Sequence, residues 1–230
     1  MRRVLFLASA LVLGLAARSA ALDPDEALKR ISWYGQSSLR IELGGKLVWI
    51  DPVGVSVQEK ADLILVTHSH GDHYSPADIR KLSGPSTLVL AGFDAPGAAR
   101  MKPGDSRKVG ELLVEAVSAY NVVKTQYHPK SALFCGFVLS AEGTRIYDAG
   151  DTERIPEMKE IVCDIALLPL GQTYTMNSVD EAVQAALDVK AKIAIPIHYG
   201  LYEGTDEDAD AFVAALEAKG VEALRIEKRK

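Results

Sequence analysis

Residues 62–73 read DLILVTHSHGDH, and this stretch decides the fold, because a short apolar run is followed at once by three of the chain's five histidines. The apolar run predicts a fully buried β-strand. Imidazole nitrogens and a carboxylate at this density suit Zn²⁺, with Fe or Mn as alternatives. In extended backbone His68 and His70 project to one side, and Asp72 and His73 around the bend can face a second ion. A histidine-rich surface loop is the alternative, but the density of ligands favours a metal site.

Three further polar residues lie beside predicted strands elsewhere in the chain. Asp151 lies in the sequence YDAGDT, His198 in IHYG and His128 in QYHPK. Folds with open α/β sheets place their sites where strand ends pass into loops. Asp151 alone could cap a turn, and His198 alone could be a buried histidine with its hydrogen bonds satisfied. Beside the histidine cluster, all three are candidate metal ligands.

Alternating short strands and helices predict an α/β fold. Ser75-Pro76 places an N-cap and a first-turn proline at one helix start, Ser178 opens a second helix with a capping box, and Thr205 begins a third. Gly35-Gln36 is interpreted as the turn that joins the first two strands. Strands are predicted at 30–34, 38–43, 46–50, 62–66, 87–91, 110–119, 133–139, 144–147, 164–168, 192–197 and 223–226.

A weak internal similarity links the two parts of the chain. In 47–51 and again in 145–148 a strand ends on Asp, and in 62–65 and 164–167 an Asp opens the next strand. This pattern suggests two related halves packed face to face. Strands often resemble one another by chance, so the similarity only supports the other observations.

The N-terminus has the pattern of a secretory signal peptide. Arg2 and Arg3 precede the apolar run 4–17, and small residues close the stretch at 19–21. The run is shorter than the ~20 apolar residues of a transmembrane helix, although an uncleaved anchor is the alternative. We therefore expect a signal peptide at 1–21, a single domain at 22–230, and a periplasmic or secreted protein without stable membrane insertion after cleavage.

Composition narrows the class of protein. The chain has 230 residues, of which 48% are hydrophobic and 25% charged, with a net charge of −5. These values exclude a disordered or collagen-like chain, and the acidic balance argues against nucleic acid as a partner. Cys135 and Cys163 both lie in or beside apolar strand-like runs. We interpret them as small buried hydrophobes rather than a disulfide, which the spacing alone cannot establish.

Taken together, these motifs resemble the metallo-β-lactamase fold superfamily of metal-dependent hydrolases. The resemblance is closest to the branch with UPF0173-type hydrolases, ascorbate-phosphate lactonases and N-acylphosphatidylethanolamine phospholipase D. It rests on THSHGDH at 67–73, AGDT at 149–152 and PIHYG at 196–200, with support from IDP at 50–52 and LPLG at 168–171. The motifs occur in the expected order over residues 31–228.

The resemblance implies a four-layer αβ/βα sandwich, in which two mixed β-sheets are flanked by helices and two divalent ions lie between the sheets. Zinc is the expected metal, with manganese or iron as alternatives. Asp51 matches an acid behind the site, and capping of the turn at Pro52 is its other interpretation. The implied ligands are His68 and His70 for the first ion, Asp72, His73 and His198 for the second, and Asp151 as the bridging carboxylate.

The chain departs from this family at the remaining ligand of the first ion. Relatives commonly have a histidine where this chain has Asn121, in the sequence AYN. Either Asn121 leaves the ion weakly held or His128, seven residues later, replaces the missing ligand. We favour His128, because it is the one histidine otherwise unassigned and polar residues flank its loop. Many relatives also have a histidine at Asp148, which is usually near the site without being a certain ligand.

The activity implied is hydrolysis of an ester, lactone or phosphodiester bond in a small-molecule substrate by a metal-bridged hydroxide, which Asp72 would orient. β-Lactamase activity is expected to be poor, because a carboxylate-bridged site is typical of thioester and phosphodiester relatives. The alternative is a non-catalytic exported metal-binding protein of the same fold. Tyr174 and Lys130 are candidates for substrate contact, although each is more often a plain surface residue. The sequence leaves the oligomeric state open.

Overall fold

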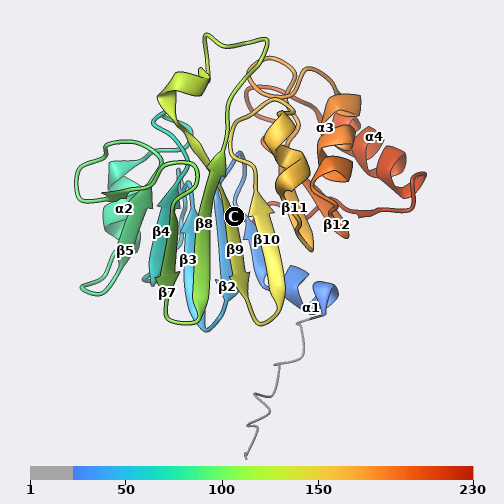
Figure 1. The fold of residues 1–230 in the computed structure, drawn as a ribbon. Coiled ribbons are helices and arrows are strands. Elements are labelled where there is room, and N and C mark those ends of the chain that lie inside the picture. The colour runs from blue at the N-terminus through green and yellow to red at the C-terminus, as the bar shows by residue number, and fades with distance from the viewer. Residues whose placement is uncertain (1–22, 230) are drawn as a thin grey trace, which may run out of the picture.

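The computed structural model describes residues 23–229 and consists of two β-sheets packed face to face between helices (Figure 1). The first sheet has six strands in the order β1 to β6, in which β1 to β3 are antiparallel and β3 to β6 are parallel. Its strands are β1 (Ile31–Trp33), β2 (Leu39–Leu43), β3 (Lys46–Ile50), β4 (Leu63–Val66), β5 (Leu88–Ala91) and β6 (Ala99–Arg100).

Successive side chains of a strand point to opposite faces of the sheet, and in this sheet both faces are covered. Val48 and Leu63 face the second sheet and belong to the larger hydrophobic cluster. Their neighbours Trp49 and Ile64 face outward and form a smaller cluster with Leu82, the last residue of helix α2 (Pro76–Leu82). Ser75 caps α2 by accepting a hydrogen bond from the Asp78 N–H, and the N-cap expected at this residue is confirmed.

The second sheet has seven strands in the order β13-β12-β11-β10-β9-β8-β7, and β10 to β13 run parallel. Helices α3 (Val179–Asp188) and α4 (Asp206–Glu217) pack against β11, β12 and β13 on its outer side (Figure 1). The four-layer sandwich of helices and two mixed sheets is therefore confirmed. Its strands are β7 (Ser106–Val109), β8 (Leu112–Ser118), β9 (Cys135–Ala141), β10 (Thr144–Asp148), β11 (Ile165–Pro169), β12 (Ile193–Ile197) and β13 (Glu222–Ala223).

Several short elements differ from the sequence prediction. Strands β6 and β7 were not predicted, because they are short, lie at sheet edges and consist largely of exposed side chains without apolar alternation. Strand β13 comprises two residues rather than the predicted 223–226. A short N-terminal helix, α1 (Pro24–Leu28), and two 3₁₀ turns, η1 (Lys130–Ala132) and η2 (Pro156–Glu160), also lacked a periodic signal.

The predicted signal peptide at 1–21 lies outside the described residues. Among residues 23–229, no helix is both long enough and apolar enough to cross a membrane. Cys135 and Cys163 are free and buried, which confirms their interpretation as small core residues. Burial raises the pKa of both thiols to about 12, so neither is a reactive thiolate at neutral pH.

Candidate metal centre

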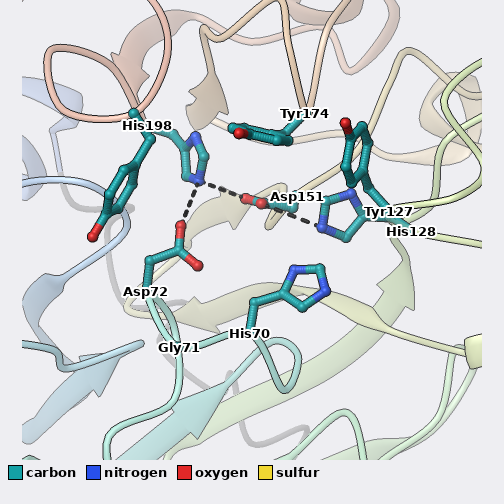
Figure 2. Close-up of a pocket in the computed structure, with 9 residues that line it drawn as sticks. His70, Gly71, Asp72, Tyr127, His128, Asp151, Tyr174 and His198 are labelled. Atoms are coloured by element: carbon teal, nitrogen blue, oxygen red, sulfur yellow. Dashed lines mark ion pairs between the residues drawn. The ribbon is translucent and has the colours of Figure 1, made fainter.

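The candidate site lies where loops leave the carboxyl ends of strands in both sheets. His68 follows β4 by two residues, Asp151 follows β10 by three, and His198 comes directly after β12. Because β10, β11 and β12 are parallel, their carboxyl ends meet at one edge of the second sheet. Figure 2 shows how these loops bring their polar side chains around one cavity.

The first group of side chains consists of His68, His70, His128 and Asp151, whose potential ligand atoms all lie within 4.8 Å of one another. His68 Nε2 lies 3.0 Å from His70 Nδ1 and 3.8 Å from Asp151 Oδ2. His128 Nε2 lies 3.4 Å from the same Asp151 oxygen. The loop that carries His128 therefore brings this histidine to the histidine cluster, as the sequence suggested.

The second group consists of Asp72, His73 and His198. His73 Nε2 and His198 Nε2 are 3.2 Å apart, and each lies 3.6 Å from Asp72 Oδ2. Asp151 Oδ1 lies 3.2 Å from both of these histidine nitrogens. The two carboxylate oxygens of Asp151 therefore face different groups.

This spacing fits a divalent cation. Ligand atoms about 2.0–2.1 Å from an ion in a tetrahedral arrangement are about 3.3 Å apart, close to most separations in both groups. Both ring nitrogens of His128 and the Oδ1 atom of Asp151 are buried and have no hydrogen-bond partner among the described residues. Buried polar atoms without partners are unusual in proteins, so the donor set suits metal ions.

A cavity of about 350 Å³ opens onto both groups. Its wall includes His70, Asp72, His128, Asp151 and His198, together with three tyrosines at positions 127, 174 and 202. Tyr127 and Tyr174 lie in an edge-to-face contact, with 4.9 Å between their ring centroids. A small molecule in the cavity would therefore touch both the candidate ligands and aromatic rings.

Comparison with known proteins agrees with this geometry. The profile described as "Beta-lactamase superfamily domain" matches residues 30–198. The chain belongs to the metallo-β-lactamase superfamily. It is 33% identical over 217 residues to a UPF0173 metal-dependent hydrolase of Archaeoglobus fulgidus, with 84% of this chain and 93% of the relative covered. A UPF0173 metal-dependent hydrolase of Geobacillus thermodenitrificans is 34% identical over 212 residues, with 81% and 92% covered.

Solved structures support the same assignment. A chain from Parabacteroides distasonis, described as a metal-dependent hydrolase, is 33% identical and superposes with a TM-score of 0.77 over 86% of this chain and 93% of its own. The metallohydrolase Igni18 from Ignicoccus hospitalis is 21% identical with a TM-score of 0.73, over 87% and 95% of the two chains, and shares the fold. The resemblance to this superfamily inferred from the motifs is therefore confirmed.

Within the first group, the electrostatics favour neutral imidazoles at His68 and His128. Burial lowers the pKa of His68 well below its usual value and lowers that of His128 to about 4. Asp151 acts in the opposite direction on both rings without overcoming burial. Neutral imidazole is the form that binds a metal ion, so this group is ready for a cation at neutral pH.

The second group has a different balance of charge. Burial opposes protonation of His73, but the carboxylates of Asp151 and Asp51 outweigh it and raise its pKa to about 10. Burial likewise opposes protonation of His198, and contacts with Asp151, Asp72 and Glu203 raise its pKa well above the usual value. Buried carboxylates thus create a strong attraction for positive charge at this group.

Asp51 supports His73 from behind. Its Oδ2 atom lies 2.7 Å from His73 Nδ1, which leaves His73 Nε2 free to face the other ligands. Both the N–H and the hydroxyl of Thr67 also donate to this carboxylate, at 2.8 and 2.6 Å. Asp51 therefore lies behind the candidate ligand His73, where a carboxylate can orient the imidazole ring.

Glu203 supports His198 in the same way, and sequence reasoning missed it. Glu203 Oε1 lies 2.9 Å from His198 Nδ1, while Oε2 accepts hydrogen bonds from the N–H groups of Thr173 and Tyr174. A Cβ atom at Gly171 would lie 1.6 Å from the Glu203 side chain, which explains the glycine of the LPLG motif. The only sequence signal was this glycine, because a lone glutamate after IHYG has no distinctive pattern.

Gln36 also contributes to the site, although the sequence indicated only a turn. Its side-chain amide donates to Asp72 Oδ2 at 3.0 Å and lies 2.8 Å from His198 Nε2. The backbone carbonyl oxygen of Gln36 accepts a hydrogen bond from the backbone N–H of His198 at 3.0 Å. The turn between β1 and β2 therefore positions two side chains of the second group.

Asp148 lies outside both groups of candidate ligands. The Asn121 amide donates to the carbonyl oxygens of Lys124 and Tyr174, so it joins two loops at the cavity. Lys130, a candidate for substrate contact, instead pairs with Glu157 and the Tyr120 hydroxyl and is absent from the cavity wall. Tyr174, the other candidate, does line the cavity.

Proposed function

We propose that this member of the metallo-β-lactamase superfamily is an exported hydrolase that holds two divalent ions and cleaves an ester, lactone or phosphodiester bond. The observation that carries the proposal is the position of Asp151. One of its oxygens faces His68 and His128, and the other faces His73 and His198, beside an open cavity. A carboxylate shared in this way is suited to hold two cations close together.

Each proposed ion has its own donors and shares Asp151 with the other. The abundance of imidazole nitrogens favours zinc, with manganese and iron as alternatives. The proposed ligands of the first ion are His68, His70, His128 and Asp151, and those of the second are Asp72, His73, His198 and Asp151.

When bound, the ions would polarise a carbonyl or phosphoryl oxygen and make a bound water acidic enough to attack near neutral pH. Asp72 is the proposed catalytic residue, since its carboxylate lines the cavity and is a quarter exposed. Gln36 fixes one oxygen of Asp72, so the carboxylate is held in place to orient the attacking water and accept its proton. No Ser or Cys nucleophile is required.

The cavity favours catalysis over the alternative, a metal-binding protein without turnover. Such a protein needs donors that enclose its ions, whereas His70, Asp72 and Asp151 all line an open space large enough for a small organic molecule. A retained metal with no turnover of any substrate would favour the alternative.

Metal analysis and turnover of a substrate panel test the proposal. Protein reconstituted with Zn²⁺ or Mn²⁺ should retain about two ions per chain and hydrolyse at least one of a thioester, a lactone, a carboxylic ester and bis-p-nitrophenyl phosphate. His70→Ala should remove most of this activity while far-UV circular dichroism stays unchanged. Asp94→Asn is the matched control, because Asp94 is exposed and pairs with Arg100 away from the cavity.

An ion content near zero in folded protein would overturn the dinuclear proposal. We also expect poor turnover of a chromogenic cephalosporin at matched metal content. Efficient cephalosporin hydrolysis without esterase or phosphodiesterase activity would contradict the proposal that the protein cleaves ester, lactone or phosphodiester bonds.

Export is proposed from the sequence pattern at residues 1–21. Cell fractionation of bacteria expressing the full chain should recover the protein outside the cytoplasm, and N-terminal sequencing should find a start near Leu22. Recovery of the intact Met1 terminus in the cytoplasm would contradict this part of the proposal.

A further inference from the structure

The cavity wall combines two features that bear on the substrate. It contains the aromatic rings of Tyr127, Tyr174 and Tyr202, and it contains no lysine or arginine among the described residues. Figure 2 shows Tyr127 beside His128 and Tyr174 above Asp151, whereas Asp72 and His198 lie on the other side of the opening. A molecule held at the metal groups would therefore extend against aromatic surface and would meet no lysine or arginine side chain in this wall.

The lysine and arginine side chains nearest in sequence or space to this cavity do not line it. Lys124 lies on the same loop as Tyr127, but its ammonium group donates to the carbonyl oxygens of Gln172 and Met176 at 3.1 and 3.0 Å. Lys228 and Arg229 line a separate cavity, which adjoins the first through Asp72 and Tyr202. None of these three cations belongs to the wall of the first cavity.

Exposed apolar side chains lie on two of the loops that carry these tyrosines. Val122 and Val123 are 55% and 70% exposed and lie on the loop of Tyr127, where their N–H groups donate to Glu153. Leu201 and Tyr202 are 62% and 61% exposed on the loop after His198. Apolar groups gathered on loops around an opening are typical of a surface that binds an apolar ligand.

We infer that the substrate is an uncharged carboxylic ester or lactone, with an aromatic or aliphatic group that packs on Tyr127 and Tyr174. This inference rests on the proposed function and narrows it. In the reaction one water is consumed, the acyl C–O bond breaks, a new bond forms between the acyl carbon and the water oxygen, and the alcohol leaves with a proton. No other reactant is needed.

The charge of the site separates this class from phosphodiesters and polyanions. Proteins that bind phosphate groups use arginine, lysine or helix N-termini, because charge-assisted hydrogen bonds offset the loss of hydration. Here the proposed ions alone would meet an anion, and no side-chain donor of positive charge lines the rest of the cavity. Aromatic rings instead favour contact with apolar groups and with the edges of other rings.

A matched substrate pair tests the inference. p-Nitrophenyl hexanoate and mono-p-nitrophenyl adipate have the same leaving group and chain length, but a terminal methyl in one replaces a carboxylate in the other. Metal-loaded protein should hydrolyse the hexanoate with a kcat/KM at least about tenfold higher. Bis-p-nitrophenyl phosphate should be slower than both esters.

Variants of the cavity wall test which residues cause the preference for the uncharged ester. Tyr174→Ala should lower kcat/KM for the hexanoate by about threefold to tenfold, the range expected for loss of an aromatic contact. Tyr202→Lys should shift the preference toward the adipate by placing a cation at the cavity. Val162→Lys is the matched control, because Val162 is also exposed but precedes β11, at the end of the strand away from the site.

A binding measurement without turnover separates failure of this inference from failure of the proposed function. Saturation-transfer NMR should detect N-phenylhexanamide but not N-phenyladipamic acid, and the signal should fall in Tyr174→Ala. This result supports the inference even if no ester is cleaved. If the protein hydrolyses the adipate as fast as the hexanoate or faster, and Lys228→Ala removes this preference for the adipate, the inference is overturned. The proposal that the protein is a hydrolase would still stand. Phosphodiester hydrolysis without esterase activity would overturn the inference in the same way.

Discussion

The two halves of the molecule share a backbone pattern but use it differently. In the first half, Asp62 directly precedes β4 and accepts a hydrogen bond from the Leu47 N–H of β3 at 2.9 Å. In the second half, Asp164 directly precedes β11 and accepts a hydrogen bond from the Arg145 N–H of β10 at 2.8 Å. The pairs β3–β4 and β10–β11 are both parallel. Asp51 comes directly after β3, and Asp148 is the last residue of β10.

These two aspartates, Asp51 and Asp148, occupy corresponding places with different surroundings. Asp51 lies beside His73 and accepts two hydrogen bonds from Thr67. Neither oxygen of Asp148 has a hydrogen-bond partner of ordinary geometry among the described residues, and burial raises its pKa well above the usual range. The comparison teaches that a repeated strand pattern can place a carboxylate, while its neighbours decide whether it supports a site.

The halves also differ in how they deliver candidate ligands. The loop after β4 carries four of them within six residues, whereas the second half carries His128, Asp151 and His198 on three separate loops. A single loop fixes its ligands relative to one another. The second half instead relies on the sheet to bring distant loops together.

The largest expected effect comes from Asp151, the residue that faces both groups. Asp151→Asn should lower the affinity of both ions by more than about 100-fold, because an outer-sphere change alone often costs ~10–100-fold. Competition with a chelator measures each affinity. Asp148→Asn is the matched control in the same segment and should retain both ions. Loss of only one ion in Asp151→Asn would show that Asp151 is not shared.

A second test compares His128 with Asn121 at the first group. His128→Ala should lower affinity for the first ion by about 100-fold, because it removes a buried nitrogen 3.4 Å from Asp151 Oδ2. Asn121→Ala should leave this affinity nearly unchanged, since its amide joins the Lys124 and Tyr174 loops. Equal affinities in wild type and His128→Ala, from the same chelator titration, would remove His128 from the ligand set.

The supporting carboxylates of the two halves provide a third test. Asp51→Asn and Glu203→Gln should each lower the affinity of the second ion by about 10–100-fold, because each carboxylate contacts the Nδ1 atom of a histidine in that group. Titration with Co²⁺, followed by its visible absorption, resolves the two ions. A loss confined to the first ion would contradict the assignment of these supports.

The smallest effect concerns the stability of the metal-free protein. The pKa of Asp148 is higher in the folded protein than the value of about 3.9 in an unfolded chain, so deprotonation above pH 4 favours unfolding. Asp148→Asn should therefore raise Tm at pH 8 by a few degrees and reduce the fall in Tm between pH 5 and pH 8. Thermal scans at both pH values measure this, and parallel pH profiles in the two proteins would contradict it.

Much of the fold could be predicted from the sequence because its central strands are apolar and bounded by turn residues. Asp62–Val66 contained the observed strand β4, and the capped helix starts at Ser75, Ser178 and Thr205 were found. Strands β6 and β7 were missed, since exposed edge strands pair through backbone groups and leave no apolar pattern. The pattern of apolar residues along the sequence therefore predicts a strand where its side chains are buried, and not where they are exposed.

The sequence by itself determined the chemistry of the candidate site. Three histidines and an aspartate within six residues, together with Asp151 and His198 at strand ends, indicated a metal centre and a family without any coordinates. Only the tertiary structure decided which further residues lie at and beside that candidate centre. His128, Glu203 and Gln36 reach it because parallel strands and a turn bring distant loops to one edge of the sandwich. Contacts of this kind depend on the direction of each side chain in space, which spacing along the chain does not encode.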